Sequence, residues 1–226
     1  MCTHRYALRQ HSGHRLVALP EGIGLVDTGS PVSLGPGGVL RFAGRDVELQ
    51  DSLRGMTPAS LSQDVGVGFD FLVGMDALRD RDVDFDLRNG SLGVGRDLGE
   101  APGEEIPLKF IGGVPALGVR VAGQHVTAVF DTGAPISYAA RRLVEGLQPV
   151  RTVEDFHPSF GQFSTPLYPV TWSVGAMDLQ GHAGILPVDF ESGLAALGVW
   201  AILGTAILLT YRARLSVTHR GLAFWP

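Results

Sequence analysis

The sequence predicts an all-β protein of two lobes, each built from one copy of a repeated β-barrel unit, with a few short helices. Composition supports this, since 45% of the residues are hydrophobic and 18% charged, and 31 Gly and 14 Pro favour short strands joined by turns. A triplet also occurs twice, as Asp27-Thr28-Gly29 and Asp131-Thr132-Gly133. The two Asp lie 104 positions apart, close to half of the 226 residues, which indicates two copies of one unit.

The residues around the two triplets match as well. Gly24 to Val26 and Ala128 to Phe130 are apolar runs that end at the Asp, and each triplet precedes a small residue, Pro, a β-branched residue and Ser. Such a run predicts a strand that ends in a tight turn, where Asp bonds the backbone and Gly accepts positive φ. One copy would indicate an ordinary turn. Two copies half a chain apart predict one carboxylate from each half.

In the first half the expected elements follow in order. They are strands at 14–19 and 23–27, a hairpin of 39–43 and 46–49, a loop at 51–64, a strand at 71–74, a short helix at 75–81, and a hairpin of 83–87 and 92–94. Alternating apolar residues predict half-buried strands, and Asn89-Gly90 accepts the positive φ that a two-residue turn requires.

The second half repeats this order. It is expected to contain a hairpin of 114–122 and 125–131, a helix at 139–147, a hairpin of 170–174 and 177–180, a strand at 201–204, and a closing hairpin of 214–218 and 222–224. Asp27 lies 17 positions before Gly44, whereas Asp131 lies 44 positions before the corresponding Gly175. The second half therefore carries about 27 extra residues at this point, including an aromatic stretch from His157 to Tyr168.

These features divide the chain into four parts. We expect an N-terminal segment at 1–13, a first lobe at 14–95, a linker at 96–105 and a second lobe at 106–226. The linker is polar and acidic and contains Gly and Pro, as is typical of a connection between lobes.

Composition also excludes several kinds of site. A net charge of −5 gives no basic surface for nucleic acid. Cys2 is the single cysteine, which excludes intrachain disulfides and cysteine-rich metal sites. The seven His lack the spacing of metal ligands, so we expect no metal, and His4, His11 and His14 are expected in a solvated segment.

The N-terminus has no apolar signal core, so a cytoplasmic location is expected. Residues 193–211 form an uncharged stretch of nineteen, long enough for a membrane span. Their counterpart in the first half, 67–78, contains Asp70 and Asp76. A buried strand followed by a short helix is therefore favoured over a membrane anchor.

The paired triplets and their surroundings resemble the aspartic peptidases, both the bilobal pepsin-like and the dimeric retroviral (retropepsin-like) forms, over residues 14–224. The resemblance implies an acid-protease-like fold with Asp27 and Asp131 as catalytic residues and no cofactor. It also implies a peptide or protein substrate, and a monomer with a pseudo-two-fold axis within the chain.

Paired carboxylates fit this chemistry because two such groups at close range share one proton. The charged member then takes a proton from water while the protonated member polarises the peptide carbonyl. By resemblance, Thr28 and Thr132 brace the opposite lobe, and Gly29 and Gly133 offer N–H groups to the carboxylates. Ser30 is expected to hydrogen-bond Asp27, which Ala134 cannot do for Asp131.

Aspartic peptidases close a β-hairpin flap over the substrate. The first half is too short for one, so the resemblance places a single flap in the second half, with Phe160, Phe163 and Tyr168 as substrate contacts. The alternative is an insertion that places these aromatic residues in the core. For the whole chain, the alternative to an aspartic endopeptidase is a peptide-binding module with little or no turnover.

Overall fold

The computed structural model describes residues 3–226. The first half contains β1 (His4–His11), β2 (His14–Leu19), β3 (Gly22–Val26), β4 (Val39–Phe42), β5 (Arg45–Glu48), α1 (Pro58–Val65), β6 (Phe71–Val73), β7 (Asp82–Asp86) and β8 (Ser91–Gly95). The second half begins with β9 (Glu105–Ile111), β10 (Val114–Val121), β11 (Gln124–Phe130), β12 (Tyr138–Ala139), η1 (Arg141–Leu143), β13 (Arg151–His157) and β14 (Gly161–Val174). It ends with β15 (Met177–Ala183), α2 (Val188–Ala196), β16 (Ala201–Leu203), η2 (Thr205–Leu209), β17 (Arg212–Ser216) and β18 (Gly221–Trp225).

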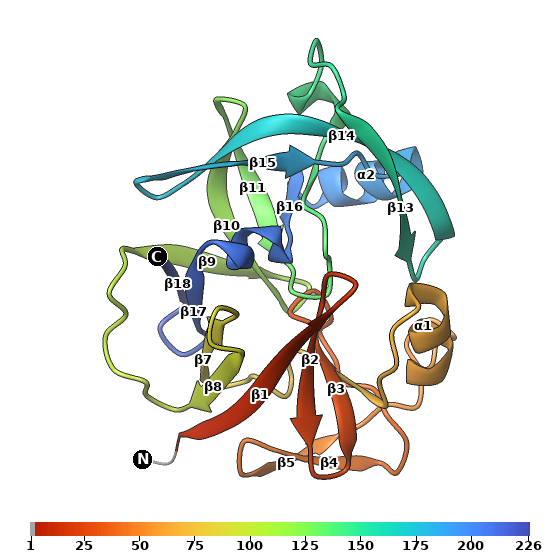
Figure 1. Cartoon of the computed structure of the whole chain (residues 1–226), viewed down its shortest axis with the longest axis vertical. Helices are drawn as coiled ribbons and strands as arrows, with labels where there is room; N and C mark the ends of the chain where they lie inside the picture. The colour runs from red at the N-terminus through yellow and green to blue at the C-terminus, as the bar shows by residue number, and fades with distance from the viewer. Residues whose placement is uncertain (1–2) are drawn as a thin grey trace.

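Each half builds the same unit from equivalent strands (Figure 1). In the first half β1, β2 and β3 pair in sequence and β3 pairs in parallel with β6; in the second, β9, β10 and β11 pair in sequence and β11 pairs in parallel with β16. A short helix precedes the last strand of each unit, α1 before β6 and α2 before β16. The expected all-β, two-lobed tandem repeat is therefore confirmed.

A six-stranded sheet joins the two halves. Its order is β9-β18-β17-β7-β8-β1, so each half contributes three neighbouring strands. At its centre β7 pairs antiparallel with β17, and Asp84 lies opposite Arg214. Arg214 also forms a bidentate ion pair with the Asp84 carboxylate, with distances of 2.6 Å from Nε to Oδ1 and 2.8 Å from Nη2 to Oδ2. The order reads the same from either edge, which places a pseudo-two-fold axis between β7 and β17.

The core is continuous between the halves. Phe85 of β7 packs edge-on against Phe130 of β11 at 6.2 Å, and Phe130 packs against Phe224 of β18 at 6.0 Å. All three side chains are almost completely buried. Burial of such large aromatic surfaces stabilises the fold by roughly 2–3 kcal/mol per side chain. The same residues therefore hold both halves together.

The region expected as a separate N-terminal segment forms a strand of the fold. Residues 4–7 of β1 pair with β8 and residues 8–11 pair with β2, which links the first unit to the shared sheet. Leu8 is the one buried residue of β1, and most of the other side chains in this strand are polar. The expectation of a solvated His14 is wrong: this side chain is 7% exposed, at the turn between β1 and β2.

The helices also differ from expectation. Residues 51–64, expected as a loop, contain most of α1, which begins with a capping box in which Thr57 Oγ1 accepts from Ser60 N and Ser60 Oγ accepts from Thr57 N. The helix expected at 75–81 is a series of turns, since the Asp76 carboxylate accepts from Ala77 N and ties this segment to Ser33. The helix expected at 139–147 is reduced to η1.

Residues 193–211 cover the end of α2, strand β16 and the 3₁₀ helix η2. Within residues 3–226, every helix is too short or too polar to cross a membrane. The uncharged stretch instead supplies the fully buried strand β16, whose three residues lie next to β11. This agrees with the expected buried strand followed by a short helix.

Candidate active site

The two Asp-Thr-Gly triplets lie next to each other, in equivalent surroundings related by the pseudo-two-fold axis. Asp27 follows β3, and its N–H donates to Val73 O at 3.0 Å; Asp131 follows β11, and its N–H donates to Leu203 O at 3.0 Å. In each half the parallel neighbouring strand, β6 or β16, therefore fixes the backbone at the point where the Asp leaves the sheet.

The two threonines hold the loops together. Thr28 Oγ1 donates to Phe130 O at 2.7 Å and accepts from Thr132 N at 2.9 Å. Thr132 Oγ1 donates to Val26 O at 2.9 Å and accepts from Thr28 N at 3.0 Å. Both side chains are fully buried, where an unpaired backbone group would be costly. The reciprocal bonds expected from the resemblance are therefore present in this geometry.

The glycines bring each carboxylate against the opposite loop. Asp27 Oδ1 accepts from Gly29 N at 2.8 Å, and Asp131 Oδ1 accepts from Gly133 N at 2.8 Å. A Cβ on Gly29 would lie 2.4 Å from the Asp131 carboxyl carbon, and a Cβ on Gly133 would lie 2.5 Å from that of Asp27. Only glycine allows so close an approach, and the two carboxyls consequently lie side by side.

Burial raises the pKa of both carboxyls. The pKa of Asp27 is raised well above its ordinary value, first by burial and next by the charge of Asp131, with N–H donors opposing. The pKa of Asp131 is also raised, again chiefly by burial. Like charges this close cannot both ionise easily, so the two carboxyls titrate as a pair.

Ser30 contributes differently from expectation. Its hydroxyl donates to Val32 O at 2.7 Å, and it is the backbone N–H of Ser30 that reaches Asp27 Oδ1, at 3.1 Å. Ala134 N makes the equivalent bond to Asp131 at 3.1 Å, so the Ser/Ala difference leaves these contacts symmetric. The bond from the Ser30 side chain to Asp27 is absent because the hydroxyl closes its own turn.

The glycines that follow β6 and β16, Gly74 and Gly204, also have equivalent contacts in the two halves. Gly74 N donates to Ser33 Oγ at 2.9 Å, and Gly204 N donates to Ser137 Oγ at 3.0 Å. A Cβ would lie 2.3 Å from Val32 O at Gly74 and 2.4 Å from Ile136 O at Gly204. The two glycines that end β6 and β16 are thus required because the loops pass directly over them.

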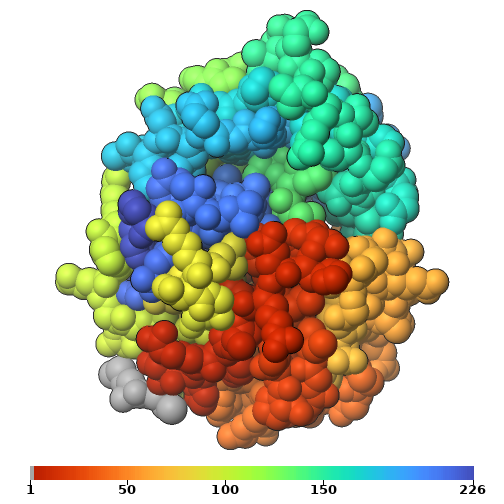
Figure 2. Space-filling model, viewed as in Figure 1, coloured from red at the N-terminus to blue at the C-terminus, as the bar shows by residue number. Residues whose placement is uncertain are grey.

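The extra residues of the second half form a hairpin that reaches the first half. β13 and the start of β14 pair from Arg151 opposite Leu167 to His157 opposite Gly161. Its turn touches the α1 region, where Arg54 Nη1 donates to Ser159 Oγ at 2.6 Å and Gln162 Nε2 donates to Asp64 O at 2.7 Å. Figure 1 shows the hairpin descending to α1, and Figure 2 shows their surfaces in contact.

The three aromatic residues expected as substrate contacts divide into two groups. Phe160 and Phe163 lie on this hairpin with ring centroids 5.4 Å apart, and Phe160 also packs against His157 and Phe190. Tyr168 lies farther along β14, where the strand pairs with β15, and packs against the main core. Phe163 also packs against the buried cluster of Tyr138, Leu186 and Ile202. The role of these aromatic residues as substrate contacts stays a prediction.

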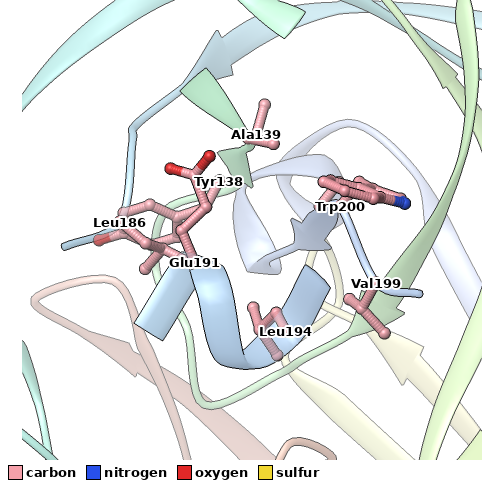
Figure 3. Close-up of a pocket in the computed structure, with 9 residues that line it drawn as sticks. Tyr138, Ala139, Leu186, Glu191, Leu194, Val199 and Trp200 are labelled. Atoms are coloured by element: carbon pink, nitrogen blue, oxygen red, sulfur yellow. The ribbon is translucent and has the colours of Figure 1, made fainter. Parts of the chain in front are cut away.

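Spacing alone did not single out two further residues beside the carboxyl pair. Tyr138 begins β12 directly after the second Asp loop, and its hydroxyl donates to Asp155 Oδ2 of β13. The charge of Asp155 raises the pKa of Asp131, and burial raises that of Tyr138. Figure 3 shows Tyr138 with Leu186 and Glu191 around a cavity of about 10 Å³ beneath β12, too small for a substrate group.

The structure is similar to the crystal structure of an aspartic proteinase from Irpex lacteus, with 9% identity, a TM-score of 0.55, and coverage of 99% of this chain and 97% of that chain. The protease of simian foamy virus matches 40% of this chain and 88% of its own, with 19% identity and a TM-score of 0.31. No protein-family model and no curated protein matches the sequence. The chain thus has an aspartic-peptidase-like fold, and at 9% identity the first likeness shows the fold alone.

Proposed function

We propose that the chain is an aspartic endopeptidase that hydrolyses peptide bonds with a water activated by Asp27 and Asp131. The observation that carries this proposal is the symmetry-related pair of carboxyls, each receiving two backbone N–H bonds and lying against the glycine of the opposite loop. Such a pair supplies one acid and one base at the same point. Both side chains are half-buried.

The proposed reaction uses the two carboxyls in turn. Asp131, as the carboxylate, takes a proton from the water as its oxygen attacks the peptide carbonyl carbon. Asp27, as the protonated member in this scheme, donates its proton toward the carbonyl oxygen, and a tetrahedral diol forms. Asp131 then passes its proton to the leaving nitrogen while Asp27 recovers one from the diol. The C–N bond breaks and the pair returns to its starting state.

The test is cleavage of a diverse peptide library from about pH 3 to pH 8, because a pair of carboxyls that works as acid and base makes the rate depend on pH. Wild-type protein is compared with Asp27→Asn and Asp131→Asn. We expect cuts that vanish in both variants, since each removes one half of the acid–base pair. Exposed Asp51→Asn is the matched control and should cleave like the wild type. Cuts that persist in either site variant would contradict the proposal.

A peptide-binding module with little turnover is the second candidate. It is favoured by the hairpin of β13 and β14, which already contacts Arg54 and the end of α1 at Asp64. The hairpin must move for a substrate to enter between these parts. Binding of a statine-containing peptide by wild type and by Asp131→Asn separates the two candidates. A binder would hold the peptide without cleaving any substrate at any pH.

The proposed substrate is an extended peptide or protein segment that lies between the carboxyl pair and the hairpin. We propose that Phe160 and Phe163 line its path and that one chain supplies both carboxyls as a monomer. The four-part division of the chain and a cytoplasmic location stay predictions. Figure 2 shows a hollow in the surface between β14–β15 and the turn that joins β1 and β2.

A further inference from the structure

We propose that Asp155 is a specificity-determining residue that favours substrates with a lysine or arginine side chain next to the scissile bond. The inference rests on the proposed peptidase function and names the class of peptide that this site accepts. It is carried by the place of Asp155 on the hairpin, by its hydrogen bonds, and by the balance of charge around the carboxyl pair.

The register of the hairpin turns Asp155 toward the site. Asp155 lies directly opposite Phe163, and side chains of directly paired residues share one face of a sheet. Phe163 packs against Tyr138 at 6.2 Å, and the Tyr138 hydroxyl donates to Asp155. Because Tyr138 directly follows the loop of Asp131, this face of the hairpin looks onto the second carboxyl loop.

The neighbouring acid faces away. Glu154 accepts from Ser164 Oγ on the opposite face of the hairpin, and both side chains are exposed. Successive residues of a strand point to opposite faces, so two adjacent carboxylates of one strand serve different surroundings. Glu154 is therefore a built-in control for a change of charge at Asp155.

The carboxylate of Asp155 keeps capacity for a cation. Its Oδ2 accepts from Tyr138 and its Oδ1 from Phe156 N, which leaves each oxygen a free lone pair. Among residues 3–226, the ion pairs are Arg41–Asp46, Arg212–Asp86 and Arg214–Asp84, so none of them neutralises Asp155. The side chain is half-buried.

Among residues 3–226, the groups that face Asp155 form no ion pair with it. They are Asp131 and Tyr138 from the second loop and His14 from the β1–β2 turn. Burial lowers the pKa of His14 below its ordinary value, and the charge of Asp155 only partly opposes this. The site therefore combines the charge of the carboxyl pair with that of Asp155, and a cationic side chain balances both.

The experiment uses two peptides that differ at one residue next to the scissile bond, lysine in one and norleucine in the other. Their kcat/KM values are compared at about pH 5, where an ordinary Asp and a lysine are both charged. For wild type we expect a lysine preference of at least about tenfold, the scale of a charge-assisted hydrogen bond. Asp155→Asn should reduce the preference to near one.

Three comparisons separate charge from position. Glu154→Gln changes the same charge on the opposite face and should keep the preference. Tyr138→Phe removes the hydrogen bond but keeps the carboxylate, so the preference should persist even if overall turnover falls. Asp155→Glu should restore part of the preference lost in Asp155→Asn.

Failure of this inference can be told from failure of the proposed function. Cleavage of both peptides at similar rates, or an unchanged preference in Asp155→Asn, would overturn the role of Asp155 and leave the peptidase intact. Dissociation constants of statine-containing versions of the two peptides give a second readout. Charge-selective binding that depends on Asp155, without any cleavage, would support the role of Asp155 and overturn the peptidase. Absence of both cleavage and binding would overturn both.

Discussion

At the scale of single residues, the two site carboxyls oppose the stability of the fold. Each is half-buried beside a like charge, and burial raises the pKa of both. The N–H bonds from Gly29 and Gly133 recover part of this cost, since they stabilise the ionised form. Side chains with strongly shifted pKa values are typical of functional sites, where the shift serves the reaction at a cost in stability.

We therefore expect Asp27→Asn to stabilise the protein at neutral pH. A carboxyl whose pKa is raised in the folded state favours folding fully below its unfolded pKa, near 3.8, and loses that contribution as pH rises through the folded pKa. The gain should be present at pH 7 and should vanish near pH 3, where the carboxyl is protonated in both states. Thermal unfolding at both pH values measures it, with Asp51→Asn as control. An equal gain at both would contradict this origin.

The residues of the site differ in how well the sequence predicts them. Asp27, Thr28 and their partners in the second triplet carry a local signal, because the lead-in strand, the turn and the spacing are all visible in the chain. The contact between Tyr138 and Asp155 depends on the register of a hairpin and on how it folds over β12. Neither residue belongs to a repeated motif, so spacing gave no reason to pair them.

At the scale of elements, the extra hairpin of the second half is a pH-sensitive part of the fold. His157 Nδ1 accepts from Ser159 N at 3.1 Å across the turn, and its ring stacks on Phe160 at 4.4 Å. Burial, assisted by the charge of Arg54, lowers the pKa of His157 to about 4. A protonated Nδ1 cannot accept this bond, so acid loosens the turn.

The neutral form is favoured in the folded state, so its stabilising contribution is complete above pH 6.5 and is lost as pH falls through about 4. We expect amide protection of residues 157–163, corrected for intrinsic exchange, to fall over this range in the wild type. His157→Phe keeps the ring stack but has no acceptor, and its protection should be lower and independent of pH. The same pH step in both proteins would show that His157 is not its cause.

Strands of the repeated unit were predicted where apolar alternation is strong, as in β7 and β8. The strand β1 was missed because it has a single buried residue, Leu8, and its place is set by pairing with β2 and β8. The strand β9 begins at Glu105, which was assigned to the acidic linker, and its place is set by pairing with β10 and β18. The capping residues Thr57 and Ser60 were present as a helix signal, yet the small and polar residues around them favoured a loop. Tertiary packing decided these elements, and local preference did not.

At the scale of the whole molecule, the halves are joined by much more than the chain connection. The shared sheet, the Arg214–Asp84 pair and the bonds of the two threonines all cross between them. We expect a specific protease site inserted after Glu100, cut after folding, to leave two associated halves. They should co-elute in native buffer, separate in denaturant, and keep the cleavage activity of the uncut protein. Spontaneous separation of the halves would contradict this.

The single hairpin has a consequence for the direction of the bound chain. In a fully symmetric pair of units, a peptide meets the same surroundings whether it runs from N to C or from C to N. Here only one side of the carboxyl pair carries β13 with Asp155 and the aromatic turn, while the corresponding part of the first half, between β3 and β4, is a short loop. The duplicated fold thereby acquires polarity, and the two sides of a scissile bond become chemically distinguishable.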